Sequence, residues 1–152
     1  MKDTKYSALQ AAEWFLAYNR ARMEEEGADR ISAPRLQKLL YYAQGCHLAL
    51  TGRALFDDAV IATSRGPVIG SVYRKYKHYL SSGIPYDDRY VCPFDEGTEN
   101  ILEEVYRVFA KYSAQGLQDL IRREDPWKET EKECEITQDR LKEYFLRSRV
   151  EK

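Results

Sequence analysis

Apolar residues recur every three or four positions from Ser32 to Gly52, and this spacing predicts a central helix. A second apolar stripe runs along the opposite side of the same helix. A helix that is apolar on two sides is normally covered on two sides. We therefore expect it at the centre of a helical domain, with another element crossing closely at Gly45. Three polar residues interrupt the second stripe: Gln37, Lys38 and Gln44.

The same spacing predicts further helices before and after the central one. The first spans residues 7–26 and ends at Gly27, since glycine commonly stops a helix. Gly66-Pro67 is expected to open another helix that runs to about Leu80, because proline is favoured in the first helical turn. Later helices are expected to begin at residues with capping side chains, namely Thr98, Ser113 and Thr137.

One stretch, Val60–Ser64, has the β-branched composition of a strand. A second short strand near Tyr90–Cys92 is expected to pair with it, inside a long loop that has no regular spacing. The chain is therefore expected to form one mainly α domain over residues 1–152. We expect five or six helices arranged around the central one, with at most a small two-stranded β element.

Composition is that of a globular domain rather than a disordered chain. Of 152 residues, 43% are hydrophobic and 32% are charged, and the formal net charge is -1. No apolar run approaches the ~20 residues of a membrane span, and the N-terminus lacks the apolar segment of a signal peptide. The three cysteines are far apart and form neither a disulfide framework nor a zinc motif. We therefore expect a cytoplasmic protein.

Residues that could carry chemistry do not form a recognisable catalytic or metal-binding pattern. Asp57-Asp58 could act as a pair of acids, but neighbouring acids in turns are usually turn formers. Cys46 and His47 are adjacent on the central helix and point about 100° apart, so they cannot easily share a metal ion. His47 lies on an apolar face, where a hydrogen-bonded structural histidine is the usual role. We expect no enzyme activity, catalytic residue, metal or cofactor.

Four motifs follow one another along the chain. The first is Leu36–Gly45, which reads Leu-Gln-Lys-Leu-Leu-Tyr-Tyr-Ala-Gln-Gly, and the others are Arg65-Gly66-Pro67-Val68, Val72–Tyr76 and Glu124–Lys128. In this order they resemble the Panacea-domain antitoxins, the SocA-like family also labelled phage-associated proteins. The chain departs from the family at two places. Cys46 stands where relatives usually have tryptophan, and Ile121-Arg122 replaces their usual Thr-His.

This resemblance implies an antitoxin that neutralises a co-encoded toxin by direct protein–protein binding, without catalysis. Two other functions remain open: a DNA-binding regulator of its own operon, and an adaptor that delivers a partner protein to a protease. The near-neutral charge does not favour nucleic acid as a partner. We expect a cognate toxin as the partner and no membrane, and we leave self-association open.

The expected partner-binding surface lies around Arg65, Gly66, Pro67 and Tyr73. At the start of the predicted helix, Arg65 and free backbone N–H groups would form an anion seat. The alternative is that Gly66-Pro67 only makes a turn. Tyr73 belongs to a basic, tyrosine-rich segment that suits either nucleic acid or a protein interface. Trp127 is expected at the edge of the surface, where it could instead fill the side of the bundle.

Overall fold

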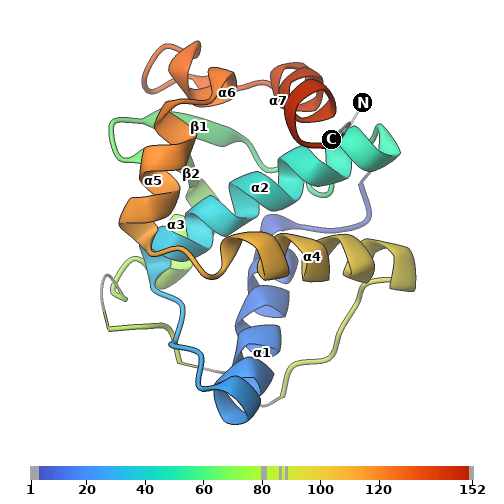
Figure 1. Ribbon diagram of the computed structural model, residues 1–152, viewed down its shortest axis with the longest axis vertical. Coiled ribbons are helices and arrows are strands. Elements are labelled where there is room, and N and C mark those ends of the chain that lie inside the picture. The colour runs from blue at the N-terminus through green and yellow to red at the C-terminus, as the bar shows by residue number, and fades with distance from the viewer. Residues whose placement is uncertain (1–3, 80–81, 86, 88, 151–152) are drawn as a thin grey trace.

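Helix α2 (Ala33–Thr51) crosses the middle of the protein, and the other elements are arranged around it (Figure 1). The computed structural model describes residues 4–79, 82–85, 87 and 89–150. Ser32 caps the start of α2 by accepting a hydrogen bond from the backbone N–H of Arg35, and Gly52 ends it with a φ of 79°. Both ends of the predicted central helix are confirmed.

Six further helices lie before and after α2 in the described part of the chain. They are α1 (Ala8–Glu26), α3 (Gly70–Tyr76), α4 (Glu96–Phe109), α5 (Ala114–Arg122), α6 (Asp125–Lys128) and α7 (Gln138–Phe145), which continues as a π-helical segment, η1 (Leu146–Val150). Figure 1 shows α4 and α7 running close to α2 and α5 beside it. The mainly α fold is therefore confirmed, with more helices than the sequence predicts.

Helix α7 approaches α2 closely at Gly45, as the place of this glycine in the apolar stripe predicts. A β-carbon built on Gly45 would lie 2.5 Å from ring atoms of Phe145, which is itself fully buried. The ring of Phe145 also packs edge-on against Tyr41 and Tyr42. Helix α7 can therefore cross α2 at this point because the residue there has no side chain.

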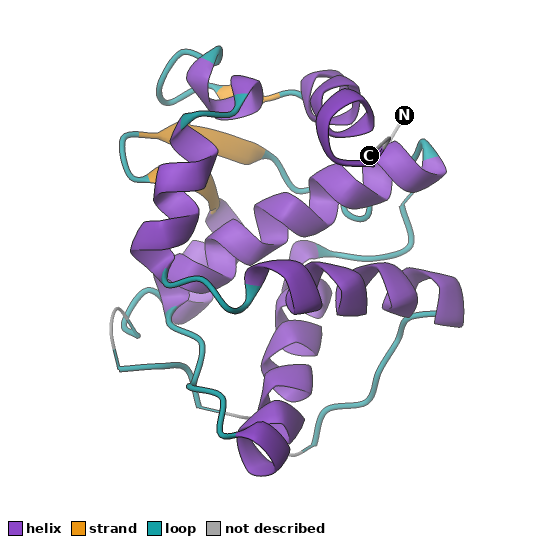
Figure 2. Cartoon of the chain, viewed as in Figure 1, coloured by secondary structure: helices purple, strands orange, loops and turns teal. Residues whose placement is uncertain are grey.

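The β structure is a three-stranded antiparallel sheet, which is larger than the predicted two-stranded element. The hairpin of β1 (Val60–Thr63) and β2 (Gly66–Ile69) is joined by β3 (Glu135–Ile136) on the other side of β1. Figure 2 shows these strands together near α5 and α6. The prediction of a strand at residues 90–92 is wrong, because this described segment has no regular structure and β3 takes the place beside β1.

The prediction of a helix starting at Gly66-Pro67 is also wrong. Residues 66–69 pair with β1, with Pro67 opposite Ala62 and Ile69 opposite Val60. Strand β2 is at an edge of the sheet, where a proline without an N–H is tolerated. Helix α3 begins only at Gly70 and ends at Tyr76, and the predicted end at Leu80 lies outside the described residues.

Side-chain hydrogen bonds test the three caps predicted after the central helix. Ser113 and Thr137 each accept from the backbone N–H three residues later, at the starts of α5 and α7, and Ser7 does the same at the start of α1. Thr98 does not cap α4. Asp95 does, and its carboxylate accepts from the N–H of Thr98 at 2.8 Å, so α4 starts earlier than predicted. Within the described helices, none is both long enough and apolar enough to cross a lipid bilayer.

Candidate functional site

Arg65 lies in the two-residue turn of the β1–β2 hairpin and not at the start of a helix. Its side chain is exposed, and its backbone N–H donates to the Thr63 hydroxyl at 3.1 Å. The same hydroxyl donates to the carbonyl of Gly66 at 2.9 Å and so holds the turn together. The predicted anion seat at a helix N-terminus therefore does not exist in this form.

Gly66 and Pro67 are buried beneath the turn rather than displayed on it. Gly66 has a φ of 110°, a conformation that residues with a side chain rarely adopt. A β-carbon at this position would lie 3.5 Å from Cε of Lys38 and 3.8 Å from its Nζ. The Gly-Pro pair therefore shapes the turn and brings it close to α2.

Trp127 is held against the same hairpin. Its indole N–H donates to the carbonyl of Thr63 at 2.8 Å, and its side chain is half-buried. The ammonium group of Lys132 lies 3.8 Å from the centre of the indole ring. The structure thus brings Trp127 next to the turn that carries Arg65, although the two residues are far apart in sequence.

Tyr73 is not linked to this group by the hydrogen bonds that hold the hairpin turn and Trp127 together. It is on α3 and is 52% exposed. Among the described residues, no hydrogen bond or ring contact joins Tyr73 to the hairpin turn. Four of the five residues singled out in the sequence therefore gather at one hairpin, and Tyr73 is a separate exposed aromatic residue.

Two further residues lie at this site, Lys38 and Arg122, which are not part of the partner-binding surface expected from the sequence. Arg122 on α5 donates to the carbonyl of Ser64 at 3.3 Å, and Lys38 on α2 lies below Gly66. Burial, together with a smaller contribution from the nearby positive charge of Arg122, lowers the pKa of Lys38 to about 8. The signal for Lys38 was available, because it is a lysine in the middle of a stripe of apolar residues.

The other polar residues of α2 hold the fold together. Gln37 accepts from the N–H of Ile69 at 2.8 Å and donates to the carbonyl of the same residue, which ties α2 to β2. Gln44 makes a similar pair of bonds with the backbone of Leu55 and Phe56. These residues are part of the motif that resembles the antitoxin family, and their hydrogen bonds are internal.

The motif around Trp127 also has an internal role. The buried carboxylate of Glu124 accepts hydrogen bonds from the hydroxyls of Tyr41, at 3.0 Å, and Tyr42, at 2.8 Å. Burial raises the pKa of Tyr41 well above its ordinary value, and the adjacent Glu124 raises it further, so Tyr41 remains a donor. Two motifs that are about 80 residues apart in sequence are therefore joined by a buried carboxylate.

The residues considered for chemistry have structural partners. His47 lies on the buried side of α2, and its Nδ1 is 2.7 Å from the carbonyl of Arg53, as expected for a structural histidine. Asp57 accepts from the Thr4 hydroxyl, and Asp58 accepts from the N–H of Ala8 and the hydroxyl of Ser71. Asp57 and Asp58 thus fix the chain ahead of α1 and the start of α3. No group of metal-ligating side chains is found within the described residues.

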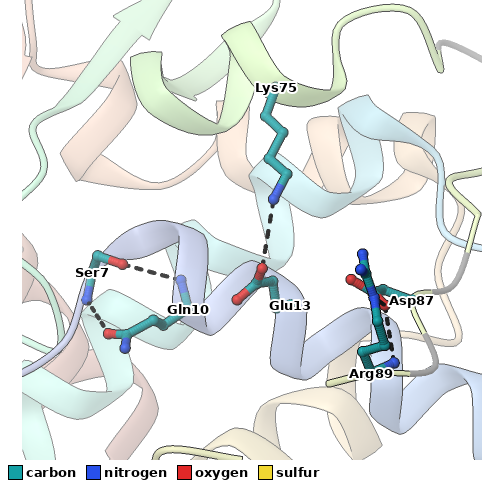
Figure 3. Close-up of polar contacts among 6 residues, drawn as sticks. All are labelled: Ser7, Gln10, Glu13, Lys75, Asp87 and Arg89. Carbon is teal, nitrogen blue, oxygen red and sulfur yellow. Dashed lines mark hydrogen bonds and ion pairs between the residues drawn. The ribbon is translucent and has the colours of Figure 1, made fainter. Parts of the chain in front are cut away.

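A cavity of about 650 Å³ lies between α1, α3 and the segment that follows α3. Its charged side chains are paired with each other. Lys75 is 3.5 Å from Glu13, and Arg89 is 3.3 Å from Asp87 (Figure 3). Figure 3 also shows Ser7 and Gln10, which cap α1. This cavity therefore presents two neutral ion pairs, and the residues found to line it include none of those singled out in the sequence.

A second cavity, of about 590 Å³, lies between α1, the start of α2 and the end of α4. Arg35 lines it and donates to the carbonyl of Ala110, the residue that caps the C-terminal end of α4. Burial lowers the pKa of Arg35. A cation at this end of a helix is favourable for the helix dipole, so Arg35 has a structural role here.

The protein is small and mainly α. The polar residues of its motifs make internal hydrogen bonds, and a basic hairpin turn is exposed at the surface. The model of the family described as "Antitoxin SocA-like, Panacea domain" matches residues 36–128, which is more than half of the chain. The chain therefore belongs to this family, and membership supports a general role in a toxin–antitoxin system. Searches of the curated proteins and of the solved structures found no match.

Proposed function

We propose that this protein is an antitoxin that neutralises a co-encoded toxin by binding it directly, without catalysis. The match of the family model to residues 36–128 carries this proposal. It also implies that the partner is a toxin, because antitoxins of this class are defined by the toxin they counteract.

The surface that we propose for the toxin is the hairpin turn with its neighbours. Arg65 offers an exposed charge, and Trp127 offers an aromatic edge next to it. Tryptophan and arginine are enriched among the residues that dominate binding energy at interfaces. Gly66 and Pro67 would contribute by fixing the shape of the turn. Tyr73 would extend the surface along α3, since an exposed tyrosine gives a large contact area at low entropic cost.

The test is co-expression with the product of the neighbouring gene, scored by growth and by co-purification. We expect the wild-type protein to restore growth and to form a stable complex. Arg65→Ala should weaken both effects and leave the fold intact, because the side chain is exposed and touches no core residue. Arg53→Ala is the matched control, because this arginine is also exposed but lies beyond the opposite end of α2, roughly 20 Å along the axis from Lys38.

Each alternative function has its own outcome in the same strains. If the toxin disappears over time only when this protein is present, the adaptor function replaces the proposal. If the protein binds upstream DNA with an affinity that falls steeply as salt rises, it is a DNA-binding regulator. If the pair neither co-purifies nor affects growth, the proposed function is wrong. If Arg65→Ala protects as well as Arg53→Ala, only the proposed surface is wrong.

A further inference from the structure

Lys38 is a buried cation whose charge is not balanced by the described part of the chain. The residue is 4% exposed, and its Nζ makes a hydrogen bond of 3.4 Å with the carbonyl of Pro34, one turn earlier in α2. Among the described ion pairs, none brings a carboxylate within 4.0 Å of this ammonium group. Buried charges in proteins are normally paired, so this lysine requires an explanation.

Other buried polar side chains of α2, unlike that of Lys38, form hydrogen bonds to other segments of the chain. Gln37 and Gln44 each make two or more hydrogen bonds to backbone groups of other segments. The buried motif carboxylate, Glu124, accepts hydrogen bonds from Tyr41 and Tyr42. Lys38 therefore differs from its neighbours, because its one hydrogen bond is long and stays within its own helix.

Further positive charges are gathered around Lys38. Arg122 lies close enough to lower the pKa of Lys38, which is an unfavourable interaction between like charges. Arg122 is held there by its hydrogen bond to the Ser64 carbonyl. The side-chain amide of Gln118 adds a second bond when its nitrogen faces the Arg65 carbonyl. In this orientation the amide oxygen of Gln118 accepts from Nη2 of Arg122 at 2.9 Å. Arg65 occupies the exposed turn itself.

Like charges held together without counter-ions cost free energy, which a negative group from outside the chain would recover. We propose that the cognate toxin places a carboxylate over the Ser64-Arg65 turn, against Arg122 and the buried Lys38, with Arg65 at the rim. This inference rests on the proposed function, because it names the group of the toxin that the same surface recognises. Arginine suits this role since its planar guanidinium matches the geometry of a carboxylate.

Affinity between the purified toxin and variants of this protein tests the inference. Lys38→Met, Arg122→Glu and Arg65→Glu should each weaken binding by about tenfold or more, and the weakening should shrink as salt rises. Arg53→Glu is the matched control and should bind like the wild type. Lys38→Met keeps an unbranched side chain that is one heavy atom shorter and removes a buried charge, so it is expected to fold, and its melting temperature reports whether it does.

The failures of the two proposals can be told apart. If the toxin does not bind the wild-type protein, both the proposed function and this inference are overturned. If the toxin binds the wild type, and the three variants bind as tightly as Arg53→Glu, only the inference is overturned. Selective loss in the three variants supports it, and an acidic residue of the toxin whose change to lysine restores binding to Arg122→Glu identifies the carboxylate.

The toxin has two kinds of carboxylate, its acidic side chains and its C-terminus, and a second arm separates them. A toxin extended at its C-terminus by a short neutral tail keeps its side chains but moves the terminal carboxylate. If the extension removes the difference between the wild type and the three variants, the C-terminal carboxylate occupies the site. If the difference persists, an acidic side chain does.

Discussion

The ammonium group of Lys38 makes the folding stability of this protein depend on pH in an unusual direction. Burial lowers its pKa from 10.5 to about 8, so between these pH values the unfolded chain holds a proton that the folded protein has released. The stability of the wild type should therefore rise with pH across this window, relative to a variant without the group. Below pH 8 both states are protonated, and the full cost of burying the charge remains.

We therefore predict that Lys38→Met is more stable than the wild type at pH 7, by up to about 3 kcal/mol. The difference should shrink as the pH rises from 8 to 10.5. Urea unfolding of both proteins at several pH values measures it. Lys77→Met is the control, because it makes the same substitution at an exposed lysine. A difference between wild type and Lys38→Met that stays constant across this range would contradict the prediction.

At Gly45, a single added β-carbon is expected to change the stability of the fold. We predict that Gly45→Ala destabilises the protein by about 1–3 kcal/mol, because the new β-carbon would overlap the buried ring of Phe145. Alanine favours a helix over glycine, so the clash must outweigh this gain. Gly97→Ala is the matched control at an exposed position of α4, where the nearest atom lies at 3.5 Å, and it should be neutral or stabilising. Thermal unfolding of the two variants compares them.

Leu39 tests the core position of α2 itself. It is fully buried, and we predict that Leu39→Ala lowers the free energy of unfolding by about 2–5 kcal/mol. The exposed leucine of the same helix, Leu50, is 55% exposed and provides the control, since Leu50→Ala should change stability by less than about 1 kcal/mol. Equal effects at the two positions would mean that the burial of α2 is not as described.

At the scale of elements, the carboxylate of Glu124 joins the start of α6 to the middle of α2. We predict that Glu124→Leu costs about 2–4 kcal/mol, because two buried tyrosine hydroxyls lose their acceptor. Adding Tyr41→Phe and Tyr42→Phe to this variant should recover part of the loss, since no unpaired hydroxyl then remains. Chemical denaturation of the single and triple variants measures the coupling. If the stability losses of the three single variants add up to the loss of the triple variant, the tyrosine hydroxyls are not coupled to Glu124 and the prediction is wrong.

Elements with local signals could be predicted from the sequence. Ser7, Ser32 and Thr137 cap their helices by bonds to residues only three positions away, so a short stretch of sequence contains the whole interaction. Asp95 caps α4 by the same kind of bond, but Thr98 is an equally suitable capping residue and was preferred in its place. The error there is a choice between two local signals.

The β2 strand could not be predicted in this way, because its cause is not local. Gly66-Pro67 is a generic helix-start signal, and nothing near it in sequence indicates pairing. The pairing is fixed by β1 and by Gln37, whose amide binds both backbone groups of Ile69 from another element. This also explains why Arg65 was expected at the start of a helix and instead lies in a hairpin turn, beside Lys38 and Arg122, which the sequence does not place there.

At the scale of the whole molecule, the family-matched span of residues 36–128 does not include all elements that cover α2. Helix α7 packs against α2 at Gly45, and β3 pairs with β1 from residues 135–136. We predict that a chain ending at Lys128 loses cooperative thermal unfolding and becomes sensitive to proteases, although the family motifs are all present. A chain ending at Val150 should behave like the wild type. Cooperative unfolding of the shorter chain would contradict this prediction.

The late position of α7 has a consequence for synthesis of the protein on the ribosome. Chains are made from the N-terminus at ~5–20 residues per second, so the apolar side of α2 around Gly45 emerges several seconds before residues 138–145 do. During this interval, Tyr41, Tyr42 and Gly45 have no α7 to pack against. The nascent chain thus exposes one side of its most apolar helix until nearly all of the described fold has been translated, and transiently exposed apolar surface of this kind favours aggregation.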